Sequence, residues 1–166
     1  MIDINAMLLC DTYKTVHNKM YDNRLTNLTS YLVPRKSMPA GQDHVVLFGV
    51  QAFVEEYMVE YFNKNFFKRD WTDLEREYRY IMDTQLGENN YAIDQVKELH
   101  DLGYLPLEIK ALPEGSVVNM GVPVVSVTNT DPRFYWLTQW VECLMQSELW
   151  LRRQAETKSL PAHFWR

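Results

Sequence analysis

Cysteine and basic charge are scarce in this chain of 166 residues, and each shortage excludes a class of protein. The two cysteines, Cys10 and Cys143, lack the paired spacing of a zinc site or a disulfide framework, so we interpret them as reduced thiols. Lysine and arginine number 17 against 22 aspartates and glutamates, which gives a formal net charge of -5. This balance provides no general attraction to nucleic acid or to an anionic membrane, so any anion site must be local.

Long apolar runs and glycine clusters are missing too. No segment is long enough to span a bilayer, and the apolar run at the start is short for a signal peptide and lacks a basic flank. We therefore expect a cytoplasmic protein without a membrane partner. The six glycines form no phosphate-binding loop, and there is no double-acidic pyrophosphate motif.

Catalytic and metal-binding side chains do not cluster in the sequence. No nucleophile has a matching base and no group of metal ligands is present, so we assign neither a catalytic residue nor a metal site. The histidines His17, His44, His100 and His163 stand alone, and a lone histidine is a weak candidate for a ligand or a base. We interpret all of them as structural.

The chain does contain enough apolar sequence for one core, because 46% of its residues are hydrophobic and 13% are aromatic at a length typical of one domain. Strands are indicated at Leu28 to Val33, by alternation from Leu107 to Ala111, and by the β-branched run Val122 to Thr128. Pro113 and Gly115 fit the second and fourth positions of a type I turn. The two later strands therefore predict an antiparallel ribbon.

Helices are predicted by apolar spacing and by capping residues. Apolar positions from Val50 to Phe62 follow the i, i+3, i+4, i+7 spacing of an amphipathic helix. Thr72 and Glu75 form a capping box for a second helix that ends at Gly87. A third helix is expected to end at Gly103.

Two further helices lie toward the ends of the chain. A short one is expected over residues 11–21, with Asp11 as its N-cap. The other has Asp131 as its N-cap, and Trp136 and Trp140 make it apolar on more than one face. We expect it to pack deeply, against the ribbon or against a missing partner. The patterns together predict an α+β fold, in which a small antiparallel sheet packs with about four to five helices.

Two stretches of this sequence resemble a known family. Residues 106–115 read Pro-Leu-Glu-Ile-Lys-Ala-Leu-Pro-Glu-Gly, and residues 129–132 read Asn-Thr-Asp-Pro. Upstream is a cluster of Asp11, Thr12, Tyr13, Lys14 and His17. These residues are similar to the N-terminal domain of the nicotinamide phosphoribosyltransferases, which carry Pro-x-Glu-Ile-Lys-Ala-x-Pro-Glu-Gly and Asp-Ser-Tyr-Lys-x-x-His motifs. The resemblance covers residues 5 to about 150 and implies the N-terminal domain fold of a type II phosphoribosyltransferase.

The resemblance implies roles for three residues. Tyr13 matches a tyrosine that stacks on the nicotinamide ring across a dimer interface, and Arg35 matches an arginine that helps to hold the pyrophosphate of phosphoribosyl pyrophosphate. Asp11 has a weaker claim to orient substrate, since helix capping explains it more simply. The alternatives are an ordinary amphipathic tyrosine for Tyr13 and a solvated basic pair for Arg35 and Lys36.

The implied function is the N-terminal part of an enzyme of NAD salvage, which converts nicotinamide and phosphoribosyl pyrophosphate into nicotinamide mononucleotide and pyrophosphate. The family's catalytic barrel is absent, so we expect no activity from this chain alone and no cofactor bound by it; Mg and ATP are expected only for the full-length enzyme. The implied partners are a second copy in a homodimer or a barrel-bearing subunit. The alternative is a non-catalytic interaction module that completes the active site of a separate barrel-bearing subunit.

The last residues depart from the family. We divide the chain into residues 1–150, the family domain, and residues 151–166, a divergent basic tail for which one interpretation is disorder. Beyond Trp150 the family continues with Tyr-Pro and Val-Ala-Thr stretches, where this sequence has Leu-Arg-Arg-Gln-Ala-Glu-Thr-Lys. A natural truncation, a frame change and a split gene would each explain the difference.

Overall fold

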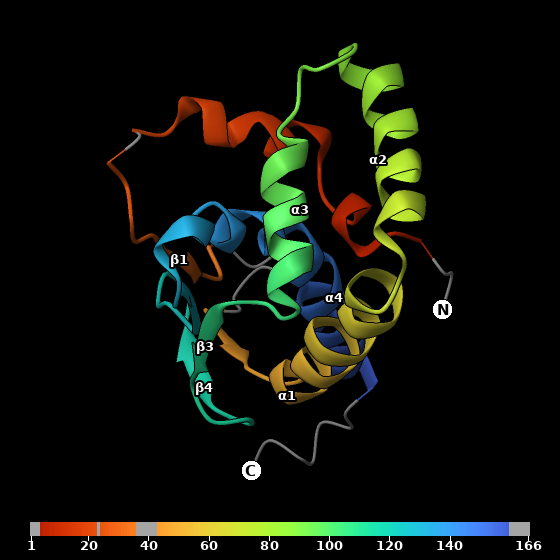
Figure 1. Ribbon diagram of the computed structural model, residues 1–166. Coiled ribbons are helices and arrows are strands. Elements are labelled where there is room, and N and C mark those ends of the chain that lie inside the picture. The colour runs from red at the N-terminus through yellow and green to blue at the C-terminus, as the bar shows by residue number, and fades with distance from the viewer. Residues whose placement is uncertain (1–3, 23, 36–42, 160–166) are drawn as a thin grey trace.

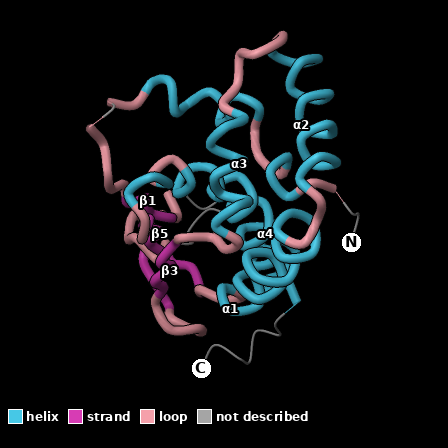
Figure 2. The backbone as a smooth tube through the Cα atoms, viewed as in Figure 1, coloured by secondary structure: helices cyan, strands magenta, loops and turns pink. Residues whose placement is uncertain are grey.

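Strands gather on one side of the molecule and most helices on the other (Figures 1 and 2). The computed structural model describes residues 4–22, 24–35 and 43–159. The strands are β1 (Thr29–Leu32), β2 (His44–Val46), β3 (Leu107–Ala111), β4 (Val117–Asn119) and β5 (Val125–Asn129). The α-helices are α1 (Val50–Phe53), α2 (Trp71–Leu86), α3 (Ile93–Leu102) and α4 (Leu137–Ser159). The 3-10 helices are η1 (Ala6–Leu8), η2 (Thr12–Met20) and η5 (Pro132–Phe134), and the π-helical segments are η3 (Val54–Tyr61) and η4 (Asn63–Phe67).

The main sheet is antiparallel, with strand order β1-β5-β3, and a second ladder joins β2 to β4. Val127 lies opposite Ser30 on one side and opposite Ile109 on the other. In β5, Val125, Val127 and Asn129 are buried while the residues between them are less so, which is the period-2 pattern of a strand packed on one face. The predicted ribbon and the α+β class are confirmed.

The turn after β3 lies one residue later than expected. The amide of Ser116 donates to the carbonyl of Pro113 at 3.1 Å, and Gly115 has a φ of +82°, so this glycine occupies the third position of the turn. The amide of Gly115 donates instead to the carbonyl of Leu47 at 2.8 Å. That cross-link to the end of the β2 segment shifts the turn.

Glu114, within the same turn, caps the helical segment that begins at Val50. Its carboxylate accepts hydrogen bonds from the amides of Gly49 (2.8 Å), Val50 (2.8 Å) and Gln51 (3.2 Å), where the first amides of a helix have no partner within it. The predicted amphipathic helix is confirmed and continues through Phe67, because η3 and η4 follow α1 directly.

Asn129 joins the end of β5 to the segment before β1. Its buried amide accepts from the amide of Leu28 (2.8 Å) and donates to the carbonyls of Thr26 and Asp131 (both 2.9 Å). A buried side-chain amide is stabilising only when its polar atoms have partners, and here both its oxygen and its nitrogen do. The Asn-Thr-Asp-Pro motif therefore begins with a structural hydrogen-bonding centre.

The helix expected after Asp131 is divided in two. Asp131 caps η5 by accepting from the amide of Arg133 at 2.9 Å, and α4 begins at Leu137. Trp136 and Trp140 are only 5% and 4% exposed, and their ring centroids lie 5.4 Å apart. The chain itself buries them, so a missing partner is not needed to cover them, contrary to one of the two expectations.

Helix α4 crosses the boundary that the sequence analysis placed at residue 150. Its backbone is helical up to Ser159, so residues 151–159 are not irregular. Residues 160–166 of the expected tail, and Lys36, lie outside the described residues. Within the described parts of the chain, the helices are too short or too polar to cross a membrane.

The start of α2 corrects the predicted capping box. Asp70 is the N-cap, and its carboxylate accepts from the amides of Thr72 (2.9 Å) and Asp73 (3.4 Å). Glu75 instead forms an ion pair with Arg79 at 2.8 Å. The helix starts one residue before Thr72, because an aspartate at position 70 competes with Thr72 for the capping role and Trp71 packs against the core.

We expect Asp70→Ala to lower the free energy of unfolding by about 1 kcal/mol, because two helix amides lose their acceptor. Urea titration followed by circular dichroism measures the change. Thr72→Ala is the matched control and should change stability by less than about 0.5 kcal/mol. The reverse order would restore the capping box that the sequence suggested.

Candidate functional site

Tyr13 lies on η2 and is 51% exposed, although η2 itself packs against α4. Three side-chain pairs fix η2 on α4. They are Asp11 with Cys143, Lys14 with Glu142, and Tyr21 with Gln139. Tyr13 is therefore presented to solvent from a segment that is tied down before and after it.

Asp11 stands at the N-cap position of η2, but its carboxylate makes no capping hydrogen bond. The Cys143 thiol donates to Asp11 Oδ2 at 3.2 Å, and the Asp11 amide donates to Cys143 Sγ at 3.3 Å. The prediction that the Asp11 side chain caps this helix is therefore wrong, although Asp11 does occupy the N-cap position. Asp11 links η2 to α4 instead.

A polar cleft of about 280 Å³ lies between the edge strand β1 and α4. It is lined by Thr29, Ser30, Tyr31, Leu32, Val127, Thr138, Gln139, Val141, Glu142, Met145 and Gln146. Gln139 and Glu142 line this cleft and also hold η2. The cleft and the helix that carries Tyr13 therefore share the same wall of α4.

Arg35 follows β1, the other wall of the cleft, and its side chain is exposed. The segment before it is fixed by the amide of Gly121, which donates to the carbonyl of Pro34 at 2.7 Å. Neither Arg35 nor Tyr13 lines the cleft itself. Arg35 follows the β1 wall, Tyr13 lies on η2, which contacts the α4 wall, and no hydrogen bond or ion pair within the described residues joins the two side chains.

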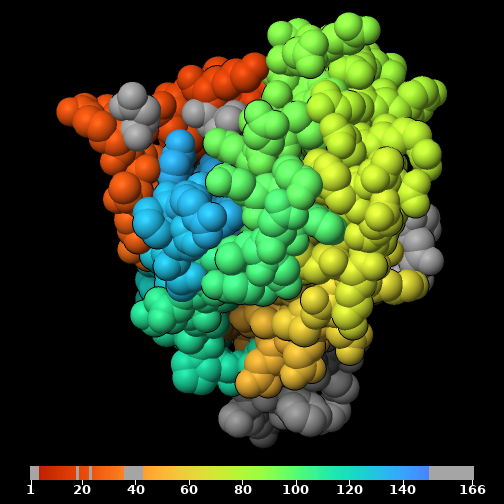
Figure 3. Space-filling view, in the orientation of Figure 1, coloured from red at the N-terminus to blue at the C-terminus, as the bar shows by residue number. Residues whose placement is uncertain are grey.

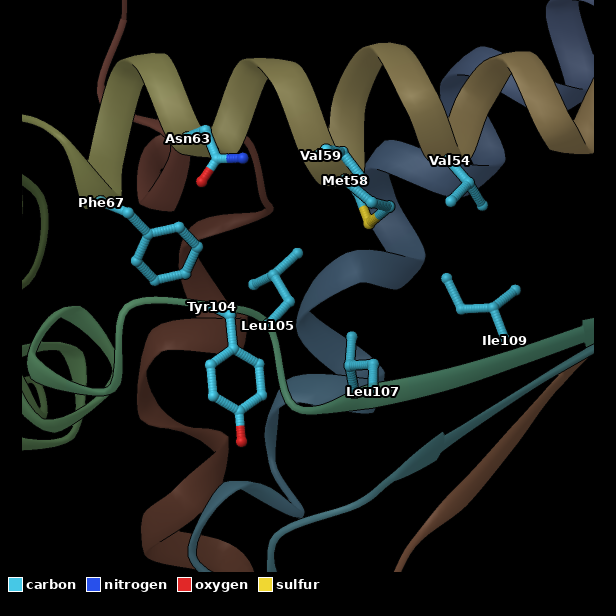
Figure 4. Close-up of a pocket in the computed structure, with 9 residues that line it drawn as sticks. All are labelled: Val54, Met58, Val59, Asn63, Phe67, Tyr104, Leu105, Leu107 and Ile109. Carbon is cyan, nitrogen blue, oxygen red and sulfur yellow. The ribbon is translucent and has the colours of Figure 1, made fainter.

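A second cleft, of about 350 Å³, lies between the Val54–Phe67 helical segment and β3 (Figure 4). Val54, Met58 and Val59 point from the helix toward Leu107 and Ile109 of the strand (Figure 4). Figure 3 shows this face, with the start of the helix in orange beside the β3 region in teal. Its lining holds no charged side chain, so it offers no charge-assisted hydrogen bond to a phosphate.

The two thiols lie near Tyr13, but their pKa values are raised, so little reactive thiolate is present at neutral pH. Burial raises the pKa of Cys10 far above its ordinary value, and burial is also the main cause of a raised pKa at Cys143. Both cysteines are free, as the sequence predicted. Among the described residues, no group of three or more histidine, cysteine, aspartate or glutamate side chains could hold a metal ion.

Comparison with known proteins assigns the chain to a family. A family model for the N-terminal domain of nicotinamide phosphoribosyltransferase matches residues 5–109. The nicotinamide phosphoribosyltransferase of Acinetobacter baylyi is 41% identical over 152 residues, which cover 89% of this chain and 30% of that protein. This chain belongs to the nicotinamide phosphoribosyltransferase family. The sequence resemblance is confirmed.

A more distant relative agrees with the assignment, and a solved structure shows a similar fold. The nicotinamide phosphoribosyltransferase of Mycoplasma pneumoniae is 24% identical over 163 residues, which cover 89% of this chain and 35% of that protein. A crystal structure of human nicotinic acid phosphoribosyltransferase superimposes with a TM-score of 0.58 at 20% identity, over 86% of this chain and 25% of that one. The latter match shows a shared fold. The chain spans about a third of the length of these family relatives.

Sequence reasoning missed Gln139 and Glu142, which connect the cleft to η2. Both lie on the helix that is predicted from its apolar side chains. The available signal was that Gln139 and Glu142 are three residues apart on a helix, hence on one face, amid apolar neighbours. A polar pair on such a face indicates a contact with another polar element, although not which one.

We expect both thiols of the native chain to react with iodoacetamide near neutral pH at least about tenfold more slowly than free cysteine, because raised pKa values leave less thiolate. Cys143 should react before the more deeply buried Cys10. Peptide mass spectrometry of timed samples measures both rates. Denaturant should bring the two rates together, and fast labelling of Cys10 in the folded chain would contradict the burial described here.

Proposed function

We propose that this chain is the nicotinamide-recognising and pyrophosphate-holding part of an enzyme that makes nicotinamide mononucleotide and pyrophosphate from nicotinamide and phosphoribosyl pyrophosphate. The observation that carries the proposal is an exposed Tyr13 on a firmly anchored helix, in a chain that belongs to this family. An aromatic face binds a flat pyridine ring by offset stacking at little cost in conformational entropy. The same face attracts the pyridinium of the product.

Arg35 supplies the second contact of the proposal. A guanidinium forms paired, charge-assisted hydrogen bonds with phosphate oxygens, which suits the pyrophosphate leaving group. Transfer passes through a ribosyl cation of oxocarbenium character, and stabilising the departing pyrophosphate electrostatically lowers its barrier. Arg35 is exposed and therefore accessible to such an anion.

The remaining chemistry belongs to polypeptide outside this chain. We propose that Mg and ATP act only in the complete enzyme, and we derive no step through them. We propose that the active site is completed in the cytoplasm by a barrel-bearing polypeptide and by a second copy of the domain. The alternative module hypothesis differs only in making that barrel a separate gene product, and because Trp136 and Trp140 are buried within this chain they do not call for such a partner.

The first test is reconstitution. The 166-residue chain alone should form no nicotinamide mononucleotide, and it should form product when co-expressed with the part of the Acinetobacter baylyi relative that lies beyond the matched region. In that complex, Tyr13→Ala should raise KM for nicotinamide roughly tenfold, and Tyr13→Phe should stay within about threefold, because stacking needs only the ring.

Tyr80→Ala is the matched control, since Tyr80 is an exposed tyrosine on α2. It should leave KM for nicotinamide unchanged. Turnover by the isolated chain, or equal effects of Tyr13→Ala and Tyr80→Ala, would refute the proposal.

The second test addresses Arg35. In the reconstituted complex, Arg35→Lys should raise KM for phosphoribosyl pyrophosphate by about ten- to a hundredfold while KM for nicotinamide changes little, because lysine keeps the charge but loses the paired geometry. Arg76→Lys, at an exposed arginine of α2, is the control. An equal rise in both KM values would indicate that Arg35 supports the fold rather than the phosphate.

A further inference from the structure

Lys14 is a charged side chain in a buried place. The side chain is only 6% exposed, and its ammonium nitrogen lies 2.5 Å from Glu142 Oε2. Burial lowers the pKa of Lys14, but the hydrogen bond and the charge of Glu142 more than offset this, so the pKa lies above its ordinary value of 10.5. The ammonium is therefore charged at neutral pH and depends on Glu142 as its partner.

The same ammonium touches the ring of Tyr13. Lys14 Nζ lies 5.3 Å from the centroid of that ring, within the range of a cation–π contact. The His17 ring lies 5.0 Å from the Tyr13 ring, centroid to centroid, at an interplanar angle of 51°. Two neighbours on η2 thus brace the tyrosine, while half of its surface stays open to solvent.

The helix that carries these residues cannot orient the ring by itself. η2 is a 3-10 helix of nine residues, and such helices rarely run beyond three or four because their hydrogen bonds are poorly aligned. Its position therefore rests on side chains that reach α4. Glu142 is itself held on α4, since its Oε1 accepts from Gln146 Nε2 at 2.9 Å. A continuous set of contacts runs from α4 through Glu142 and Lys14 to Tyr13.

We propose that Lys14 and Glu142 are positioning residues that fix the ring of Tyr13 for a flat, nitrogen-containing aromatic ligand. The identity of that ligand as nicotinamide rests on the proposed function; the orientation of the ring does not. The ion pair between the buried Lys14 and the partly exposed Glu142 sets where the ammonium lies, and the ammonium sets one side of the ring. The open side is left for stacking.

The first measurement is ¹⁹F NMR of the 166-residue chain labelled with 3-fluorotyrosine. The chain has ten tyrosines, and each should give its own resonance. Loss of one resonance in Tyr13→Phe assigns that of Tyr13. The main variant is the double replacement Lys14→Met with Glu142→Met, which removes both charges and leaves neither one unpaired in the interior. We expect the Tyr13 resonance to move toward its position in unfolded protein while tyrosines remote from η2 keep theirs. Lys14→Arg in the chain with Glu142 intact keeps the charge and should leave the Tyr13 resonance near its wild-type position.

A matched control exists on α3. Lys97 Nζ lies 5.4 Å from the centroid of a Trp71 ring and is paired with Asp101, so Lys97→Met removes the same kind of contact elsewhere. It should leave the Tyr13 resonance in place. The second measurement is KM for nicotinamide in the reconstituted complex, where the double variant should raise it about three- to tenfold with kcat and KM for phosphoribosyl pyrophosphate within about twofold.

The outcomes separate the two proposals. An unmoved Tyr13 resonance in the folded double variant would overturn the positioning role. A shift of all ten resonances toward their unfolded positions would also overturn it, because it would show that the ion pair supports the whole fold rather than the ring. If the wild-type complex makes no product while the Tyr13 resonance moves as expected, the proposed function fails and the control of the ring by Lys14 stands.

Discussion

Helix α4 is apolar on more than one face, and the need to bury those faces at once organises the rest of the molecule. The main sheet, α1 and η2 all pack against it. Leu137, Val141 and Leu144 are buried along its length, Trp140 is buried in its first turn, and Trp136 is buried directly before it. Burying large apolar side chains is the main favourable contribution to folding, so elements distant in sequence converge on this helix.

Polar groups then decide how each element sits on that apolar scaffold. Glu114 gives the amides at the start of α1 their acceptor, and Asn129 ties the chain before β1 to the end of β5. Both residues belong to the stretches through which the sequence resembles its family. Their role in this domain is to satisfy buried or terminal backbone groups, which gives these motifs a structural function.

The candidate site combines a rigid support with an exposed side chain. Tyr13 presents a large ring to solvent, yet Lys14 beside it is buried and paired with Glu142. Placing a charge in such a position is costly unless its partner is fixed, and a fixed partner in turn limits how the neighbouring ring can move. A surface tyrosine on a free loop would have no such restraint, and its binding would carry a larger entropic cost.

The sequence by itself determined the strand ribbon and the helix from Val50, because both depend on local apolar periodicity. It also determined the helix ends at Gly87 and Gly103, where glycine adopts a positive φ, and the family, which depends on sequence motifs. It misjudged the cap of α2 and the turn at Gly115, where two local rules competed and a contact elsewhere chose between them. Only the tertiary structure decided that Asp11 accepts a hydrogen bond from the Cys143 thiol and that Lys14 forms an ion pair with Glu142, since each partner lies more than a hundred residues away. Local pattern determines which secondary structure a segment adopts, whereas the pairing of side chains distant in sequence depends on which segments the packing of the core brings together.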